Sequence, residues 1–135
     1  MRRLPPAAAL LVALVLAGCG ARSSKPFTAD ASAACFTKKG FTNVTTATAK
    51  VGFIAGVAAN GGLAARSRAG NALTVAFAAD AQDAVVTEGE FRKYAPASLR
   101  PHMADIMESK RNAVLVWTVS PSAKDLADAE SCLAS

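Results

Sequence analysis

The pattern of apolar and polar residues predicts strands in four segments of this chain. Residues 112–119 are almost continuously apolar, which is typical of a strand covered on both faces and predicts a central place in a sheet. Residues 72–78 alternate between large apolar and small or polar side chains, the pattern of a half-buried strand. With 62–66 and the turn at 67–71 they predict a hairpin, and the β-branched residues of 41–48 predict another strand.

Capping residues and helical spacing predict four helices around these strands. The segment 51–59 is apolar but contains two glycines, so its sequence is compatible with a strand, with a bulged continuation and with a loop packed over the core. The four predicted helices run from Thr28 or Asp30 to Lys39 before Gly40, from the N-cap Asp80 toward Tyr94 before Pro96, from Leu99 to Lys110, and from the N-cap Ser120 to Leu133.

The order of these elements predicts the fold class. Helices that follow and precede strands of a hairpin-containing sheet can all pack on the same side of it. We therefore expect residues 28–135 to form one α+β domain, a two-layer sandwich with helices on one face of a small, mainly antiparallel sheet.

The N-terminal residues predict how the protein is held in the cell. An apolar run at 7–17 follows Met1-Arg2-Arg3 and leads into Leu16-Ala17-Gly18-Cys19. The run is too short to span a hydrocarbon core of about 30 Å and is typical of a secretory signal. The motif resembles the lipobox of bacterial lipoproteins. That resemblance implies a signal peptide at 1–18, lipidation of Cys19, and a tether at 19–27 on the extracytoplasmic face of a membrane.

The remaining chain resembles small lipoproteins and secreted domains of high-GC bacteria. The similar features are Cys35-Phe-Thr-Lys-Lys-Gly-Phe41, the apolar strand at 112–119, and Cys132-Leu133 near the C-terminus. The resemblance implies a location in the cell envelope but no activity.

Charge and cysteine content narrow the class of protein further. The chain has 15 basic and 10 acidic residues, so loss of Arg2 and Arg3 with the signal leaves a net charge of +3. The basic residues are scattered as pairs without interleaved aromatic residues, which argues against a nucleic-acid partner. With Cys19 assigned to the lipid, Cys35 and Cys132 are expected to form a disulfide in an oxidising compartment, rather than a metal pair or a catalytic thiol.

Candidate catalytic or ligand-binding groups are few. His102 is the only histidine, with Asp105 three residues later, and no Gly-x-Ser-x-Gly elbow accompanies them. The carboxylates Glu88, Glu90, Asp105 and Glu108 have no spacing that marks an acid–base pair. Backbone amides near Gly61-Gly62 and Gly70-Asn71, with Arg66 and Arg68, could hold an anion, although hairpin turns need glycine in any case.

We therefore expect no catalytic residue, no cofactor and no metal site. Trp117 is expected in the core and Tyr94 on a partly exposed helix face. The leading hypothesis is a non-enzymatic lipoprotein whose domain binds a partner protein or another envelope component. The alternative is a module for a small apolar molecule or lipid, with 51–65 as a movable cover. A third hypothesis is an enzyme of unknown class.

Overall fold

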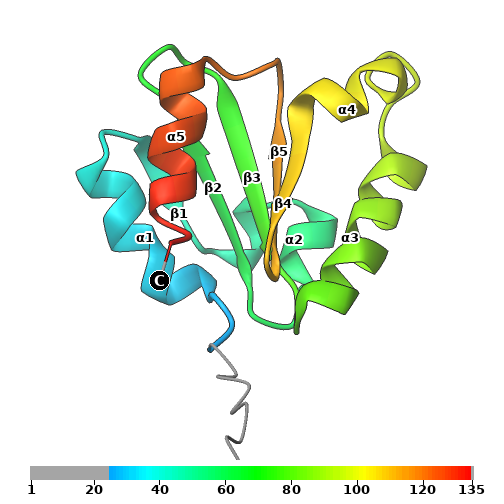
Figure 1. Cartoon of the computed structure of the whole chain (residues 1–135), viewed down its shortest axis with the longest axis horizontal. Coiled ribbons are helices and arrows are strands. Elements are labelled where there is room, and N and C mark those ends of the chain that lie inside the picture. The colour runs from blue at the N-terminus through cyan, green and yellow to red at the C-terminus, as the bar shows by residue number, and fades with distance from the viewer. Residues whose placement is uncertain (1–24, 135) are drawn as a thin grey trace, which may run out of the picture.

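The computed structural model describes residues 25–134, which fold around a five-stranded sheet (Figure 1). Every neighbouring pair of strands is antiparallel, in the order β1-β2-β3-β5-β4. The predicted α+β class with an antiparallel sheet is therefore confirmed. The strands are β1 (Thr42–Thr45), β2 (Gly62–Arg66), β3 (Ala72–Phe77), β4 (Met107–Lys110) and β5 (Ala113–Trp117).

The three longer helices, α1, α3 and α5, begin at side chains that accept hydrogen bonds from their first turns. Thr28 caps α1, Asp80 caps α3 and Ser122 caps α5, each through a side-chain oxygen that accepts from a backbone N–H three residues later. The helices are α1 (Ala29–Lys38), α2 (Phe53–Gly56), α3 (Ala81–Tyr94), α4 (Met103–Ile106) and α5 (Ala123–Ser131), with 3₁₀ turns η1 (Thr48–Lys50) and η2 (Arg100–His102).

The main core lies on the face of the sheet that carries α1, α4 and α5 (Figure 1). Fully buried side chains from the sheet, including Phe77 and Leu115, pack there against Phe36 of α1 and Leu133 after α5. Trp117 is 2% exposed and belongs to this core, as predicted. All of these core residues lie between Ala29 and Leu133, so a chain of residues 20–135 keeps the whole core.

A second helical layer, which the sequence did not predict, covers part of the opposite face. Because successive strand residues point to opposite faces, Ala76 of β3 and Val114 of β5 point away from the main core. Ala76 packs against Val51 and Ala55 of the η1–α2 segment, and Val114 packs against Ala84 of α3. Figure 1 shows α2 behind the sheet and α5 in front of it.

The predicted helix over 99–110 is wrong. Its first part is η2 and the single turn α4, but Met107–Lys110 is the edge strand β4. Lys110 pairs with Ala113, and Arg111 turns the chain with a φ of 54°. As a strand, this segment gains backbone hydrogen bonds and cross-strand contacts with β5. As a helix, the polar residues Glu108 to Lys110 would offer no apolar side chain to bury against the sheet.

Other predicted element boundaries also differ from those in the structure. Strand β1 covers only part of 41–48, and 51–59 forms α2 and a turn rather than a strand. The last helix begins after Ser122 and not after Ser120, because Ser122 Oγ accepts the Asp125 N–H. The hairpin of β2 and β3, the helix after Asp80 and the strand within 112–119 are confirmed.

A disulfide joins Cys35 of α1 to Cys132 at the end of α5, with Cα atoms 5.6 Å apart and a sequence separation of 97. The predicted pairing is therefore present, and such a bond is typical of proteins in an oxidising compartment outside the cytoplasm. The signal at 1–18, the lipidated Cys19 and the first part of the tether lie outside the described residues. Among residues 25–134, no helix is long and apolar enough to cross a membrane.

Candidate ligand-binding site

An apolar groove opens between α2 and α3 on the second face of the sheet. It encloses about 510 Å³, within the range of small-molecule sites. Strand β3 forms its floor and the two helices form its walls. The groove, here called the α2–α3 groove, is lined by Val51, Gly52, Phe53, Ile54, Ala55, Thr74, Phe91 and Tyr94.

The short helix α2 is held so that its aromatic residue faces outward. Val51 and Ala55 are buried against the sheet, whereas Phe53 between them is 80% exposed. Gly52 supports this geometry with a φ of 85°, which other residues rarely adopt. Gly62 of β2 lies so close to Ala55 that a Cβ atom there would approach the Ala55 carbonyl oxygen at 2.6 Å. These two glycines let α2 lie against β2 and present Phe53 at the mouth of the groove.

The opposite wall also carries exposed apolar surface. Tyr94, in the last turn of α3, is 60% exposed, and Lys93 Nζ lies 5.1 Å from the centre of its ring. Phe91, one turn earlier, is half-buried against the sheet. The groove is therefore an open, largely apolar trough with an aromatic residue on each rim.

A second hollow adjoins this groove across β1, β2 and β3. It encloses about 650 Å³ and includes the cations Lys50 and Arg66; we call it the basic hollow. Thr74 lines both hollows, and Lys50 precedes Val51 of the groove. Among residues 25–134, no Asp or Glu lines either one.

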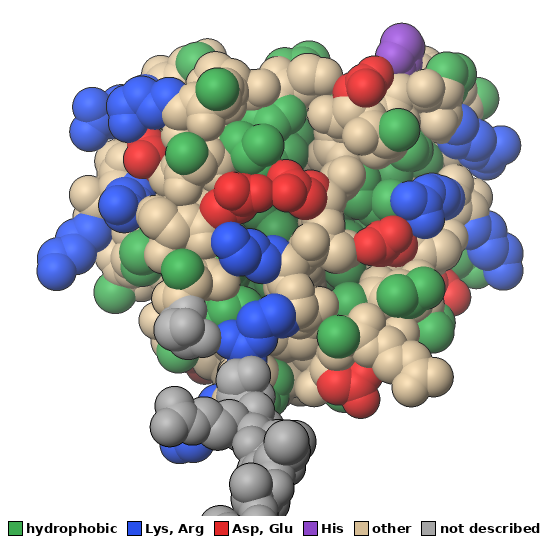
Figure 2. All heavy atoms as spheres, viewed as in Figure 1, with side chains coloured by type: hydrophobic (Ala, Val, Ile, Leu, Met, Phe, Trp, Pro, Cys, Tyr) green, Lys and Arg blue, Asp and Glu red, His purple; other side chains and the backbone are tan. Residues whose placement is uncertain are grey.

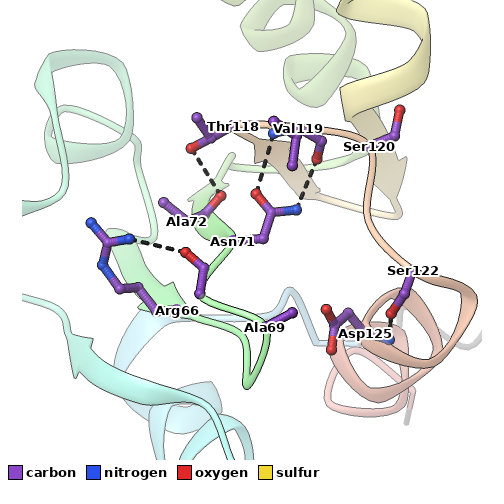
Figure 3. Close-up of a pocket in the computed structure, with 10 residues that line it drawn as sticks. Arg66, Ala69, Asn71, Ala72, Thr118, Val119, Ser120, Ser122 and Asp125 are labelled. Atoms are coloured by element: carbon purple, nitrogen blue, oxygen red, sulfur yellow. Dashed lines mark hydrogen bonds between the residues drawn. The ribbon is translucent and has the colours of Figure 1, made fainter.

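The tip of the β2–β3 hairpin forms a further pocket with the start of α5, of about 490 Å³ (Figure 3). It shares Arg66 and Ala72 with the basic hollow and has Asp125 on its border. Arg66 donates to the Gly70 carbonyl at 3.0 Å, and the Asn71 side chain exchanges two hydrogen bonds with the Val119 backbone. The Arg66 bond therefore lies within the hairpin, and the Asn71 bonds hold its tip to the segment that follows β5. Gly61-Gly62 lies at the other end of β2, so the residues of the predicted anion cradle do not meet at one place.

The other sequence candidates are dispersed. His102 is exposed on η2, while Asp105 lies in α4. Glu88 of α3 accepts a hydrogen bond from Ser109 of β4 and pairs with Arg92 at 3.3 Å. Among residues 25–134, no three His, Cys, Asp or Glu side chains come together as a metal site.

One pair of carboxyl groups does meet, between β4 and α5. A hydrogen bond with Glu130 raises the pKa of Glu108, and partial burial and the charge of Glu130 raise it further. Figure 2 shows acidic side chains gathered near the centre of this face. A cleft of about 250 Å³ beside them reaches Trp117, whose Nε1 is buried without a hydrogen-bond partner among the described residues.

Fold and geometry define the class of protein as a disulfide-linked antiparallel α+β domain with one apolar and one basic hollow on the second face of its sheet. Comparison with family models, curated proteins and solved structures finds no match to the chain.

Only part of the predicted cover over 51–65 lies at the groove. Residues 51–55 form one wall, whereas 62–65 belong to strand β2, paired with β1 and β3, and are therefore no movable cover. Phe53 was missed, although its place between Gly52 and Gly56 is a signal for a short, exposed turn. The opposite wall was missed because nothing in the sequence brings Tyr94 toward α2.

Proposed function

We propose that this protein is a non-enzymatic binding domain of the cell envelope and that it holds an apolar ligand in the α2–α3 groove. One observation carries the proposal: Phe53 and Tyr94 are largely exposed on opposite rims of the same concave, apolar surface. Single exposed apolar residues are common, but a contiguous concave patch marks an interaction site.

The size of the groove supports the choice of a small ligand. Its volume of about 510 Å³ lies within the range of about 300–1,000 Å³ that small-molecule sites occupy. A ligand that covers Phe53 would stabilise the complex by about 1.5–3 kcal/mol through that side chain alone.

The anchoring part of the proposal rests on the lipobox-like residues before Cys19 and on the disulfide. A protein exported to an oxidising compartment forms such a bond readily. Substitution Cys19→Ser tests the anchor: we expect the variant in the soluble fraction and the unaltered protein with the membranes. Retention of the variant on the membrane would show that Cys19 does not carry the anchor.

The groove is tested with the uncharged dye Nile red, whose fluorescence rises in apolar sites. A chain of residues 20–135 should enhance the fluorescence. Phe53→Ser should raise the Kd for the dye tenfold or more, as expected for a loss of about 1.5 kcal/mol or more. The matched control is Val85→Ser, because Val85 is 66% exposed on α3 but does not line the groove. Equal dye binding by all three chains would refute the proposed site.

The hypothesis that the protein is an enzyme makes a different prediction. If the protein is a hydrolase that uses its single histidine, a broad substrate screen should find turnover that His102→Ala abolishes. We expect no turnover by either chain.

A further inference from the structure

We infer that the ligand of the α2–α3 groove is an anionic amphiphile, with its apolar body between Phe53 and Tyr94 and its acidic end in the basic hollow. This inference rests on the proposed function, because it assigns a ligand class to the same site. It adds two statements about the ligand that the apolar groove alone does not require: the ligand carries a negative charge, and its charged end points toward the basic hollow.

The two hollows form one path across the sheet. Thr74 of β3 lines both, and among the described residues its hydroxyl has no hydrogen-bond partner. Lys50 and Val51 are consecutive, and the first lines the basic hollow while the second lines the groove. A molecule that extends from Tyr94 past Thr74 therefore passes from apolar to basic surroundings.

The charges at the basic end are uncompensated within the site. The basic hollow has Lys50 and Arg66 on its borders and no acidic residue among residues 25–134. The ion pairs in the described part of the chain, Arg92–Glu88 and Lys124–Asp128, involve neither cation. Arg66 donates to the Gly70 carbonyl, which holds its guanidinium at the hairpin tip, where Asp125 borders the adjoining pocket without an ion pair to Arg66. Lys50 is therefore the cation on which the inference chiefly rests.

The floor of the basic hollow suits a small head group. The sheet residues on its border include the small side chains of Ala64 and Ala72 beside Thr74. A carboxylate or phosphate there would gain charge-assisted hydrogen bonds from Lys50 or Arg66, which are stronger than bonds between neutral groups. A neutral or cationic end would gain none of these.

The test compares two ligands that share one chain length and differ in charge. Dodecanoate and dodecanol, each below the concentration at which it aggregates, compete with Nile red for residues 20–135. We expect dodecanoate to bind about tenfold more tightly than dodecanol, the effect of one charge-assisted hydrogen bond. High salt should reduce this difference, because both cations lie at the surface.

Variants locate the charge effect. Lys50→Gln should weaken dodecanoate about tenfold and leave dodecanol unchanged, whereas Lys38→Gln, an exposed lysine on α1 outside both hollows, should change neither. Lys50 bonds to no other side chain among residues 25–134, so its loss should leave the thermal midpoint unchanged.

Each other outcome overturns a defined part of the argument. Equal affinity for dodecanoate and dodecanol, unaffected by Lys50→Gln, refutes the anionic ligand and leaves the apolar site standing. Failure of Nile red and of both competitors to bind refutes the site itself. Binding to phosphatidylglycerol-containing vesicles without binding of monomeric dodecanoate refutes the inference in favour of a membrane surface.

Discussion

Removal of the Cys35–Cys132 disulfide is the sharpest test of how this domain is stabilised. The bond closes a loop of 97 positions, nearly the whole described chain. In the chain-entropy model, a loop of about 100 residues restricts the unfolded state by about 4.7 kcal/mol. A domain of this size has a total stability of about 5–15 kcal/mol, so the double variant Cys35→Ala/Cys132→Ala should be close to the limit of folding.

The measurement is urea unfolding of residues 20–135, followed by the fluorescence of Trp117. This residue is the only tryptophan in the chain and is 2% exposed in the fold, so its emission reports core opening. With a urea dependence of about 1–3 kcal/mol/M, the midpoint should fall by roughly 1.6–4.7 M. The dependence itself should rise, because the uncrosslinked unfolded chain exposes more surface.

The reduced natural chain is the control for packing changes at the two alanines. It should unfold at the same midpoint as the double variant. A midpoint that changes by less than about 0.5 M in both would refute the assignment of the stability to loop closure. Alkylation of both thiols in the folded, unreduced natural chain would show that the bond does not form.

Three further substitutions probe single contacts. Asp80→Ala removes the acceptor of the Asp83 N–H at 2.8 Å and should cost about 1 kcal/mol in urea unfolding. Asn112→Ala removes a buried side chain that accepts from the Phe27 N–H and donates to two carbonyls, so the unfolding free energy should fall by about 2 kcal/mol or more. Glu108→Gln addresses pH dependence. The Glu130 hydrogen bond raises the pKa of Glu108, so the folded state holds that proton more tightly than the unfolded state. The free energy of unfolding of the natural chain should therefore decline as the pH rises above about 4.5 through the folded pKa. Urea unfolding at several pH values measures this decline, and Glu108→Gln should lack the part that Glu108 contributes.

Matched variants test the Glu108 and Asn112 predictions. Glu90→Gln, on the exposed part of α3, should keep the natural pH dependence, and the same decline in Glu108→Gln would contradict the role of the carboxyl pair. Ala34→Gly on the exposed face of α1 should cost about 1 kcal/mol through helix propensity alone, so a smaller loss in Asn112→Ala would show that the buried amide bonds contribute little.

Local sequence signals determined much of the fold. The alternation in β3, the continuous apolar run of β5 and the caps at Thr28 and Asp80 each depend on neighbouring residues only. The Cys35–Cys132 pairing also followed from the sequence, because assignment of Cys19 to lipid leaves two cysteines. These features depend on residues close together in the sequence or, for the disulfide, on the number of cysteines in the chain.

The tertiary structure alone decided the rest. Glu108 to Lys110 form strand β4 only because β5 offers them a partner across the turn at Arg111. The groove exists only because α2 and α3, which are far apart in the sequence, lie on the same face of the sheet. Phe53, Tyr94 and Lys50 carry no common motif, so their proximity is a property of long-range packing that no local pattern encodes.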